Sequence, residues 1–318
     1  MRLRKRRNAP SRWLIESDAM LNLSAYAAHE ALVRPARAKA QVWRLAIGLI
    51  LVAGVFLLGN QFLHQTLFTL LGPDGYARLT GADGSVSQIS VIFLLMTFGL
   101  LTIGVLVALK VAHVRGFGEV LGARELFRSQ FWSVLFVLVL LNIVLVLLPP
   151  WDMGAPLVPN VPFTAWLVML PVALLAVLVQ VSAEEILFRG YLQQQFAGRF
   201  KSPLIWMLVP SALFGIGHYM PTEAAENANL IAIWAVVFGL LMADLTARAG
   251  TLGPAIAVHL VNNVIAIVFV SMPDSLSGLS LYVSPFSMDD TEWVRAWLPV
   301  EFAMMLVSWL AARLAIRR

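Results

Sequence analysis

The sequence predicts an all-α integral membrane protein, with about eight transmembrane helices around a polar intramembrane cavity and both termini in the cytoplasm. Composition, apolar runs and the distribution of basic residues lead to this fold class. Hydrophobic residues make up 59% of the 318 positions, and charged residues only 13%. Soluble domains are closer to half apolar and a quarter charged. A water-soluble fold of this length could not bury so much apolar surface, so lipid must cover part of it.

Eight apolar runs approach the roughly 20 residues that a helix needs to cross a bilayer. Two of them are weaker than the others, because they are shorter or are interrupted by Pro210 and by small residues. The six clear runs are 45–63, 89–109, 131–148, 163–181, 252–270 and 298–316. The two weaker runs are 204–218 and 230–242.

Basic residues predict the orientation, because cytoplasmic segments of membrane proteins are enriched in Lys and Arg. Ten of the 23 basic residues precede Leu45. With that end inside and eight crossings, only Arg78 and Arg295 fall outside. The inside positions are Lys110, Arg115, Arg124, Arg128, Arg189, Arg199, Lys201, Arg248, Arg313, Arg317 and Arg318.

The same pattern divides the chain into a basic cytoplasmic leader, residues 1–42, and a polytopic membrane domain, residues 43–318. Apolar residues of the leader favour an interfacial helix, although a basic tail without fixed structure fits equally well; they are Trp13, Leu14, Met20, Leu21 and Leu23. A second short interfacial helix is expected near 116–121. The net charge of +5 is scattered over inside segments, so it does not indicate nucleic-acid binding. The absence of cysteine excludes disulfides and thiolate metal sites.

Ionisable side chains inside apolar helices are costly and mark the place to look for function. The sequence shows three such clusters, all in the second half of the chain. The first contains Glu184, Glu185 and Arg189. Glu185 and Arg189 are four residues apart and predict an ion pair on one helical face. Glu184 lies about 100° away around the helix and needs another partner.

The other two clusters are Phe214 with His218, and His259 with Asn263. Each alone is compatible with a capping residue or a helix-to-helix hydrogen bond. Together, the acids, imidazoles and amide supply what peptide hydrolysis requires. They include a carboxylate that takes a proton from water, a histidine that shares it and donors for the oxyanion. No Gly-x-Ser-x-Gly or His-Glu-x-x-His segment is present.

These three motifs, in this order, resemble the CPBP family of CAAX proteases and bacteriocin-processing enzymes, also called the Abi or type II CAAX prenyl endopeptidase family. The similarity covers about residues 160–270. It implies cleavage of a peptide bond of a membrane-associated substrate, in a cavity open toward the cytoplasm. It also implies that Glu184 and His218 activate water, that His259 and Asn263 stabilise the oxyanion, and that Glu185, Arg189 and Phe214 support the site. The resemblance allows a zinc ion on Glu184, His218 and His259, but we expect a metal-free mechanism without a cofactor.

One feature does not fit straight helices. Glu184 is expected near the cytoplasmic end of the fourth span and His218 near the outer end of the fifth. That arrangement would separate them by some 20 Å in depth at 1.5 Å per residue. Either one of the helices starts deeper than its hydropathy suggests, or the fifth span is short and lies within the cavity.

Two other functional classes remain. A proton-coupled transporter would use the same groups as a relay, although no internal repeat is visible. A non-catalytic scaffold or immunity protein would use them only to hold helices together. The lack of cysteine and the short outside segments favour a bacterial inner membrane. The expected partners are the lipid bilayer and a membrane-associated protein or peptide substrate.

Overall fold

The computed structural model describes residues 25–148, 156–273 and 276–318. Within these residues the chain is mostly helical, and six helices are long and apolar enough to cross a membrane. They are α3 (Val42–Thr80), Gln88–His113, α7 (Arg124–Leu147), Phe163–Arg199, Pro221–Ala249 and α14 (Thr291–Ala315). Two shorter apolar helices are α10 (Pro203–Gly217) and the segment Gly253–Phe269. The chain is therefore an integral membrane protein, whereas eight crossings remain a prediction.

Several of these long helices consist of consecutive segments. Gln88–His113 contains α4 (Gln88–Thr97), α5 (Gly99–Ala108) and the π-helix η1 (Leu109–His113). Phe163–Arg199 contains α8 (Phe163–Glu185), the π-helix η2 (Ile186–Leu192) and α9 (Gln193–Arg199). Pro221–Ala249 contains α11 (Pro221–Ala224), the 3-10 turn η3 (Ala225–Asn227) and α12 (Ala228–Ala249). Gly253–Phe269 contains α13 (Gly253–Val264) and the π-helix η4 (Ile265–Phe269).

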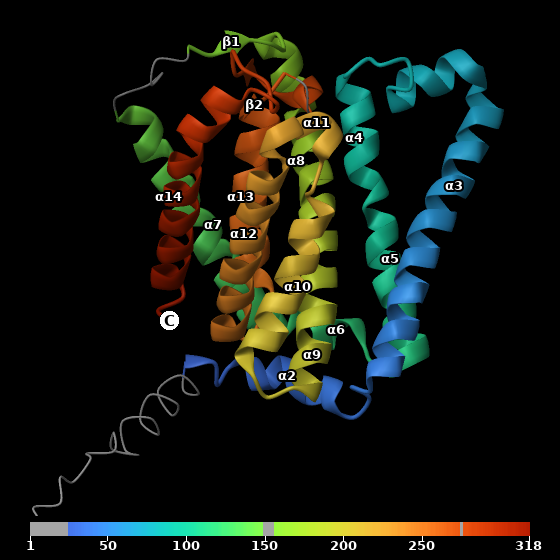
Figure 1. Ribbon diagram of the computed structural model, residues 1–318, viewed down its shortest axis with the longest axis vertical. Coiled ribbons are helices and arrows are strands. Elements are labelled where there is room, and N and C mark those ends of the chain that lie inside the picture. Colours follow the sequence, from blue (N-terminus) through green and yellow to red (C-terminus); the bar gives the residue numbers. More distant parts are fainter. Residues whose placement is uncertain (1–24, 149–155, 274–275) are drawn as a thin grey trace, which may run out of the picture.

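Consecutive helices run in alternating directions, and α2 (His29–Arg37) and the C-terminus both lie toward the lower end of the bundle in Figure 1. An even number of crossings requires this arrangement. Trp13, Leu14, Met20, Leu21 and Leu23, on which the interfacial helix of the leader was predicted, lie outside the described residues. The short helix expected near 116–121 is confirmed as α6 (Phe117–Leu121).

The lengths of two spans differ from the hydropathy prediction. The run 230–242 is one of the two weaker candidates for a membrane span, but it belongs to a helix of 29 residues. The run 252–270 is one of the six clear candidates, but it forms a short helix. In the first case, the polar residues Glu223 and Glu226 lower the hydropathy at the start of the helix, so the apolar run begins later than the helix does. In the second, Gly253 and Pro254 begin the helix and a strand follows Phe269.

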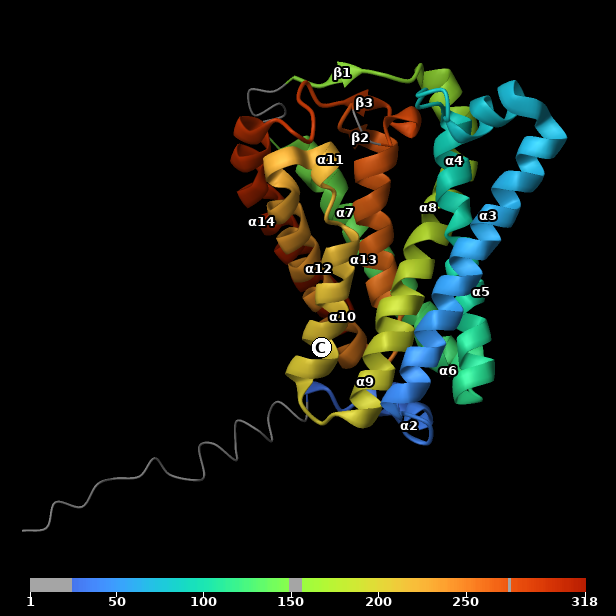
Figure 2. The same ribbon diagram turned by 45° about the vertical axis from the view of Figure 1, so that its right-hand side comes forward.

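The all-α prediction misses a small sheet at the upper end of the bundle (Figure 2). Its strands are β1 (Val158–Pro159), β2 (Val270–Ser271) and β3 (Tyr282–Val283), in the order β1-β3-β2. β1 pairs antiparallel with β3, and β2 pairs parallel with it. The Asn160 side chain donates hydrogen bonds to the backbone oxygens of Ser277, which begins the turn η5 (Ser277–Leu279), and of Ser280, which follows it. These segments therefore form a cap over the bundle.

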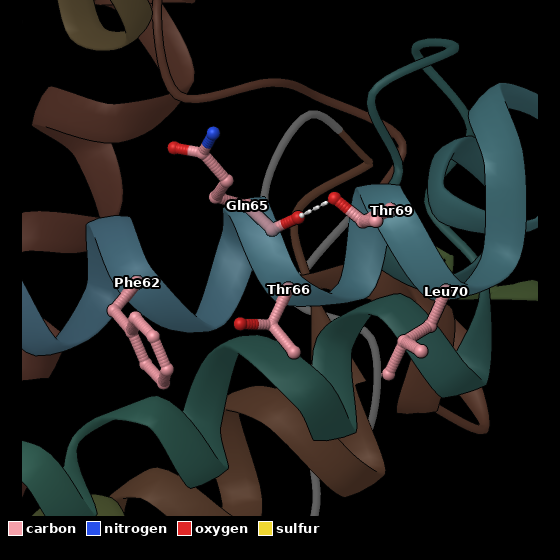
Figure 3. Close-up of a pocket in the computed structure, with 5 residues that line it drawn as sticks. All are labelled: Phe62, Gln65, Thr66, Thr69 and Leu70. Atoms are coloured by element: carbon pink, nitrogen blue, oxygen red, sulfur yellow. Dashed lines mark hydrogen bonds between the residues drawn. The ribbon is translucent and has the colours of Figure 1, made fainter.

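The helices α3 and α4 diverge toward the upper end in both views of the ribbon (Figures 1 and 2). At Gly72 the backbone of α3 takes a left-handed φ of 69°, directly before Pro73, and the helix changes direction there. A shallow surface pocket on α3 precedes this bend (Figure 3) and is lined by Phe62, Gln65, Thr66, Thr69 and Leu70. None of these residues belongs to the three polar motifs.

Candidate active site

The three motifs lie at one level of the bundle, on α8, α10 and α13. Glu184 and Glu185 end α8, but the helix continues through η2 and α9 to Arg199. Glu184 is thus 15 residues, or about 22 Å, from that end of the helix. His218 follows α10 and is also 15 residues, again about 22 Å, from Pro203 at the same end. The separation in depth expected from straight spans is therefore absent, because the fourth span extends far beyond residue 181 and α10 is short.

Glu185 is the acceptor of two hydrogen bonds and is completely buried. Its Oε1 accepts from Arg189 Nη1 at 3.0 Å and from His259 Nδ1 at 2.8 Å. The predicted ion pair between Glu185 and Arg189 is confirmed. Arg189 was counted as an inside-loop charge, and that assignment is wrong: its side chain is 1% exposed in the interior. The guanidinium balances the charge of Glu185, which a buried carboxylate requires.

Glu184 has the second partner that its position on the helix demands. His259 Nε2 lies 3.5 Å from Glu184 Oε2, so the imidazole of His259 lies between the two glutamates. Glu184 is 7% exposed, and its Oε2 has no hydrogen-bond partner among the described residues. An unpaired buried carboxylate oxygen carries a desolvation cost and is free to bind water or substrate.

His218 and Phe214 connect α10 to this pair. His218 Nδ1 is 2.8 Å from the carbonyl oxygen of Phe214. Since a carbonyl only accepts, Nδ1 carries the hydrogen and Nε2 of the neutral ring is an acceptor. The Phe214 ring lies 4.3 Å from the His218 ring and 6.0 Å from the His259 ring, between centroids. The two imidazoles are therefore no further apart than the sum of these distances.

Phe214 also contacts the ion pair, since the Arg189 guanidinium lies 4.7 Å from its ring centroid. Further aromatic rings extend this wall from η2 and α12. Phe188 meets Phe214 edge to face, Phe238 lies 4.9 Å from the His259 ring, and Trp234 stacks on Phe238. The rings exclude water from one side of the imidazoles, which strengthens electrostatic interactions there.

Asn263 is held by two amides. Its Nδ2 donates to Gln180 Oε1 at 2.9 Å, and its Oδ1 accepts from Asn262 Nδ2 at 3.2 Å. Gln180 lies outside the three motifs. The sequence does contain a sign of its importance: Gln180 is a polar residue in the apolar run 163–181. It lies four residues before Glu184, and this spacing places both side chains on one helical face.

Small residues bring the site helices together. A Cβ on Gly239 of α12 would lie 2.9 Å from the Cβ of Ser211 on α10, and one on Gly215 would lie 2.8 Å from the carbonyl oxygen of Ala232. Such contacts let helix backbones approach closely in a membrane. The close approach of α10 to α12 places the Phe214 ring 6.1 Å from the Phe238 ring, between centroids.

The first half of the chain also carries buried polar groups, contrary to the expectation that it has none. His113 Nε2 bonds to the Tyr191 hydroxyl at 2.8 Å, and its Nδ1 bonds to the carbonyl oxygen of Lys39 at 2.9 Å. Arg115, counted as an inside-loop charge, is buried and donates to Gln194 Oε1 at 2.9 Å. Burial lowers the pKa of Arg115. These contacts join the segment between α2 and α3, η1 and the turn after η1 to η2 and α9, directly after the glutamates.

A zinc ion would need three or more of these side chains around one point. Among the described residues, no group of three or more His, Asp or Glu side chains is arranged to hold a metal ion. Both nitrogens of His259 face glutamate oxygens, and His218 Nδ1 is bonded to a backbone carbonyl. The arrangement in this structure does not fit a zinc site.

The comparison with known proteins agrees with the motifs. Residues 164–265 match the Rce1-like family model, described as Type II CAAX prenyl endopeptidase Rce1-like. The resemblance predicted from the three motifs is confirmed. The uncharacterized protein YyaK of Bacillus subtilis strain 168 is 26% identical over 250 residues, which cover 77% of this chain and 84% of the relative. No solved structure gives a significant match. The matched family is a protease family, and Glu184, Glu185, Arg189, Phe214, His218 and His259 lie within the matched segment.

Proposed function

We propose that this chain is an intramembrane endopeptidase that hydrolyses a peptide bond of a membrane-associated protein or peptide, with Glu184 as the general base. One observation carries the proposal. Glu184 Oε2 is buried, has no hydrogen-bond partner among the described residues and lies 3.5 Å from His259 Nε2. The Oε2 of its neighbour Glu185 also has no partner among the described residues, but Glu185 Oε1 forms an ion pair with Arg189 at 3.0 Å. The two glutamates thus have different roles, one reactive and one structural.

The hydrogen bonds define where protons sit before reaction. Arg189 keeps Glu185 ionised, and Glu185 accepts from His259 Nδ1. His259 Nε2 then faces the Glu184 carboxylate, and two acceptors at this distance repel unless one carries a proton. We infer from this contact that the two groups share one proton. With this proton on His259, Glu184 is an ionised base beside an imidazolium donor.

In the chemical step, Glu184 removes a proton from a water molecule, and the water oxygen bonds to the carbonyl carbon of the scissile peptide. His218 Nε2, the acceptor of its ring, orients this water. The carbonyl electron pair moves to the oxygen, which becomes an oxyanion. The carbon–nitrogen bond then breaks, and the proton held by Glu184 passes to the leaving amine. The products are a carboxylic acid and an amine; the acid passes its proton to the amine, which leaves a carboxylate and an ammonium group, and the site returns to its starting state.

The oxyanion needs donors that are already in place. His259 Nε2–H and the second Nδ2–H of Asn263 serve this purpose, because the two residues are four apart and lie on one face of α13. No nucleic-acid partner is proposed. The bacterial relative supports a bacterial plasma membrane, and the basic leader supports cytoplasmic termini.

The proposal is tested with a quenched fluorescent peptide library and purified protein in detergent. We expect wild type to cleave, and Glu184→Gln, His218→Ala and His259→Ala to remain folded without cleaving. Glu125→Gln, at an exposed position of α7, is the matched control and keeps full activity. A chelator arm with wild type tests zinc separately: loss of activity that added zinc restores would contradict the metal-free mechanism. Cleavage by Glu184→Gln at the wild-type rate would refute the proposal.

A further inference from the structure

We propose that Gln180 is a positioning residue for the oxyanion donor Asn263. This inference rests on the proposed function, which it extends by one residue outside the three motifs. Gln180 is 6% exposed, within the membrane-spanning part of α8. Its Oε1 accepts a hydrogen bond from Asn263 Nδ2 at 2.9 Å.

Two helices meet here at two successive levels. Gln180 is one turn before Glu184 on α8, and Asn263 is one turn after His259 on α13. The lower level joins both glutamates to His259, and the upper level joins two amides. The hydrogen bond between Gln180 and Asn263 therefore adjoins the proposed reaction centre and shares its two helices.

The orientation of the Asn263 amide decides whether it helps or opposes the reaction. One face of the group offers N–H donors and the other offers only an acceptor oxygen. In the observed orientation, one Nδ2 hydrogen goes to Gln180 Oε1, and Oδ1 accepts from Asn262. The second Nδ2 hydrogen remains for an oxyanion, and the side chain is only half-buried. Rotation by 180° would instead turn Oδ1 toward Gln180 Oε1 and toward the oxyanion, and both contacts would be repulsive.

Gln180 consequently selects the donating orientation before substrate arrives. A donor that needs no reorientation during the reaction contributes most to stabilising the transition state. Removal of the Gln180 acceptor would leave the Asn263 amide free to rotate. Because Gln180 acts through Asn263 and touches no reacting atom, its effect should vanish when Asn263 is absent.

The test is a double-mutant cycle on kcat and KM with a peptide that wild type cleaves. Gln180→Met keeps the length of the side chain but removes the acceptor. We expect it to lower kcat roughly 10-fold with little change in KM, whereas Asn263→Ala lowers kcat roughly 100-fold. The double variant should equal Asn263→Ala alone. Ser182→Ala, two residues along α8, is the control and should match wild type.

The outcomes separate this inference from the proposed function. If wild type cleaves and Glu184→Gln does not, but Gln180→Met keeps the wild-type kcat, the positioning role is refuted and the protease function stands. The positioning role would also be refuted if the kcat loss of the double variant equalled the product of the losses of the two single variants. If no peptide is cleaved by wild type, both proposals fall. Thermal unfolding in detergent identifies a variant that does not fold, and Gln180→Ala then takes its place in the cycle.

Discussion

The inner and outer helices of this bundle are similarly apolar, but they have different surroundings. In the helix Pro221–Ala249, half of the most apolar stretch is buried inside the bundle. In Phe163–Arg199, a third of the corresponding stretch is buried. The corresponding share is 17% for α3 and 11% each for α7 and α14. Proposed chemistry is confined to inner helices, where a buried ionisable group finds partners. Outer helices face lipid, and comparable substitutions there should have little effect.

The largest expected difference concerns two histidines in membrane helices. His259→Phe removes the group between the two glutamates and should lower cleavage by roughly 10²–10⁴-fold. His64 on α3 bonds only to the Tyr76 hydroxyl, among the described residues, so His64→Phe should leave cleavage unchanged. Initial rates with one fluorescent peptide compare the two. Equal losses would show that the distinction between inner and outer helices does not predict function.

Arg189 offers the corresponding test of stability. Arg189→Met leaves the Glu185 carboxylate buried without its cation and should cost about 3–5 kcal/mol of unfolding free energy. The double variant Arg189→Met/Glu185→Gln should recover most of this loss, because no uncompensated charge remains. Arg78→Met, at an exposed position of α3, should stay within about 0.5 kcal/mol of wild type. Denaturant titration in detergent measures all three, and a loss in the double variant as large as in the single one would contradict the ion-pair account.

A pair of phenylalanines compares packing alone. Phe238 is 2% exposed and contacts His259, Phe214 and Trp234, whereas Phe62 on α3 is 75% exposed to the surroundings of the bundle. Phe238→Ala should cost about 3 kcal/mol, because it leaves a cavity. Phe62→Ala exchanges a contact with lipid for another and should cost far less. Thermal unfolding compares the two variants, and similar midpoints would contradict the assigned packing.

The smallest effect is expected outside the membrane spans, at α2. His29 is buried against Trp206 and next to Gln193, and burial lowers its pKa from 6.5 to about 4. The folded chain binds this proton less readily than the unfolded chain. The stability contribution is therefore complete above pH 6.5 and is lost as the pH falls toward 4. At pH 5 the loss should be about 2 kcal/mol.

Hydrogen exchange of the α2 amides at pH 7 and pH 5, corrected for intrinsic rates, measures this loss. Two further titratable groups, Tyr26 and Asp244, form a hydrogen bond with each other where this part of the chain meets the bundle, and burial raises the pKa of Tyr26 to about 12. The pH dependence from His29 must therefore be isolated. His29→Phe should remove most of it, whereas an unchanged dependence in that variant would assign it to another group.

Local sequence patterns predicted much of the site. The four-residue spacings correctly indicated the Glu185–Arg189 pair and the common face of His259 and Asn263, because a helix fixes those geometries. The structure shows that the three motifs meet. Their assigned catalytic roles remain proposals.

Other features depend on partners that are distant in sequence. Arg115 looks like a cytoplasmic charge until Gln194, 79 positions away, is seen beside it. Gln180 stands out only because its side chain accepts a hydrogen bond from Asn263, which is 83 positions away in the sequence. Hydropathy missed the C-terminal turns of Phe163–Arg199 and Pro221–Ala249, since they carry buried polar residues such as Gln193 and Asp244. It missed the first turn of Pro221–Ala249 because Glu223 and Glu226 are polar and exposed there.

Cleavage within a lipid bilayer is the measurement that tests the central claim most directly. Wild type, Glu184→Gln and the outer-helix control Glu125→Gln are reconstituted into liposomes with a membrane-anchored peptide that the library selects. Mass spectrometry then identifies the products. The account predicts one new carboxyl terminus and its matching amine with wild type and Glu125→Gln, and intact peptide with Glu184→Gln. The same products from folded Glu184→Gln would contradict the account.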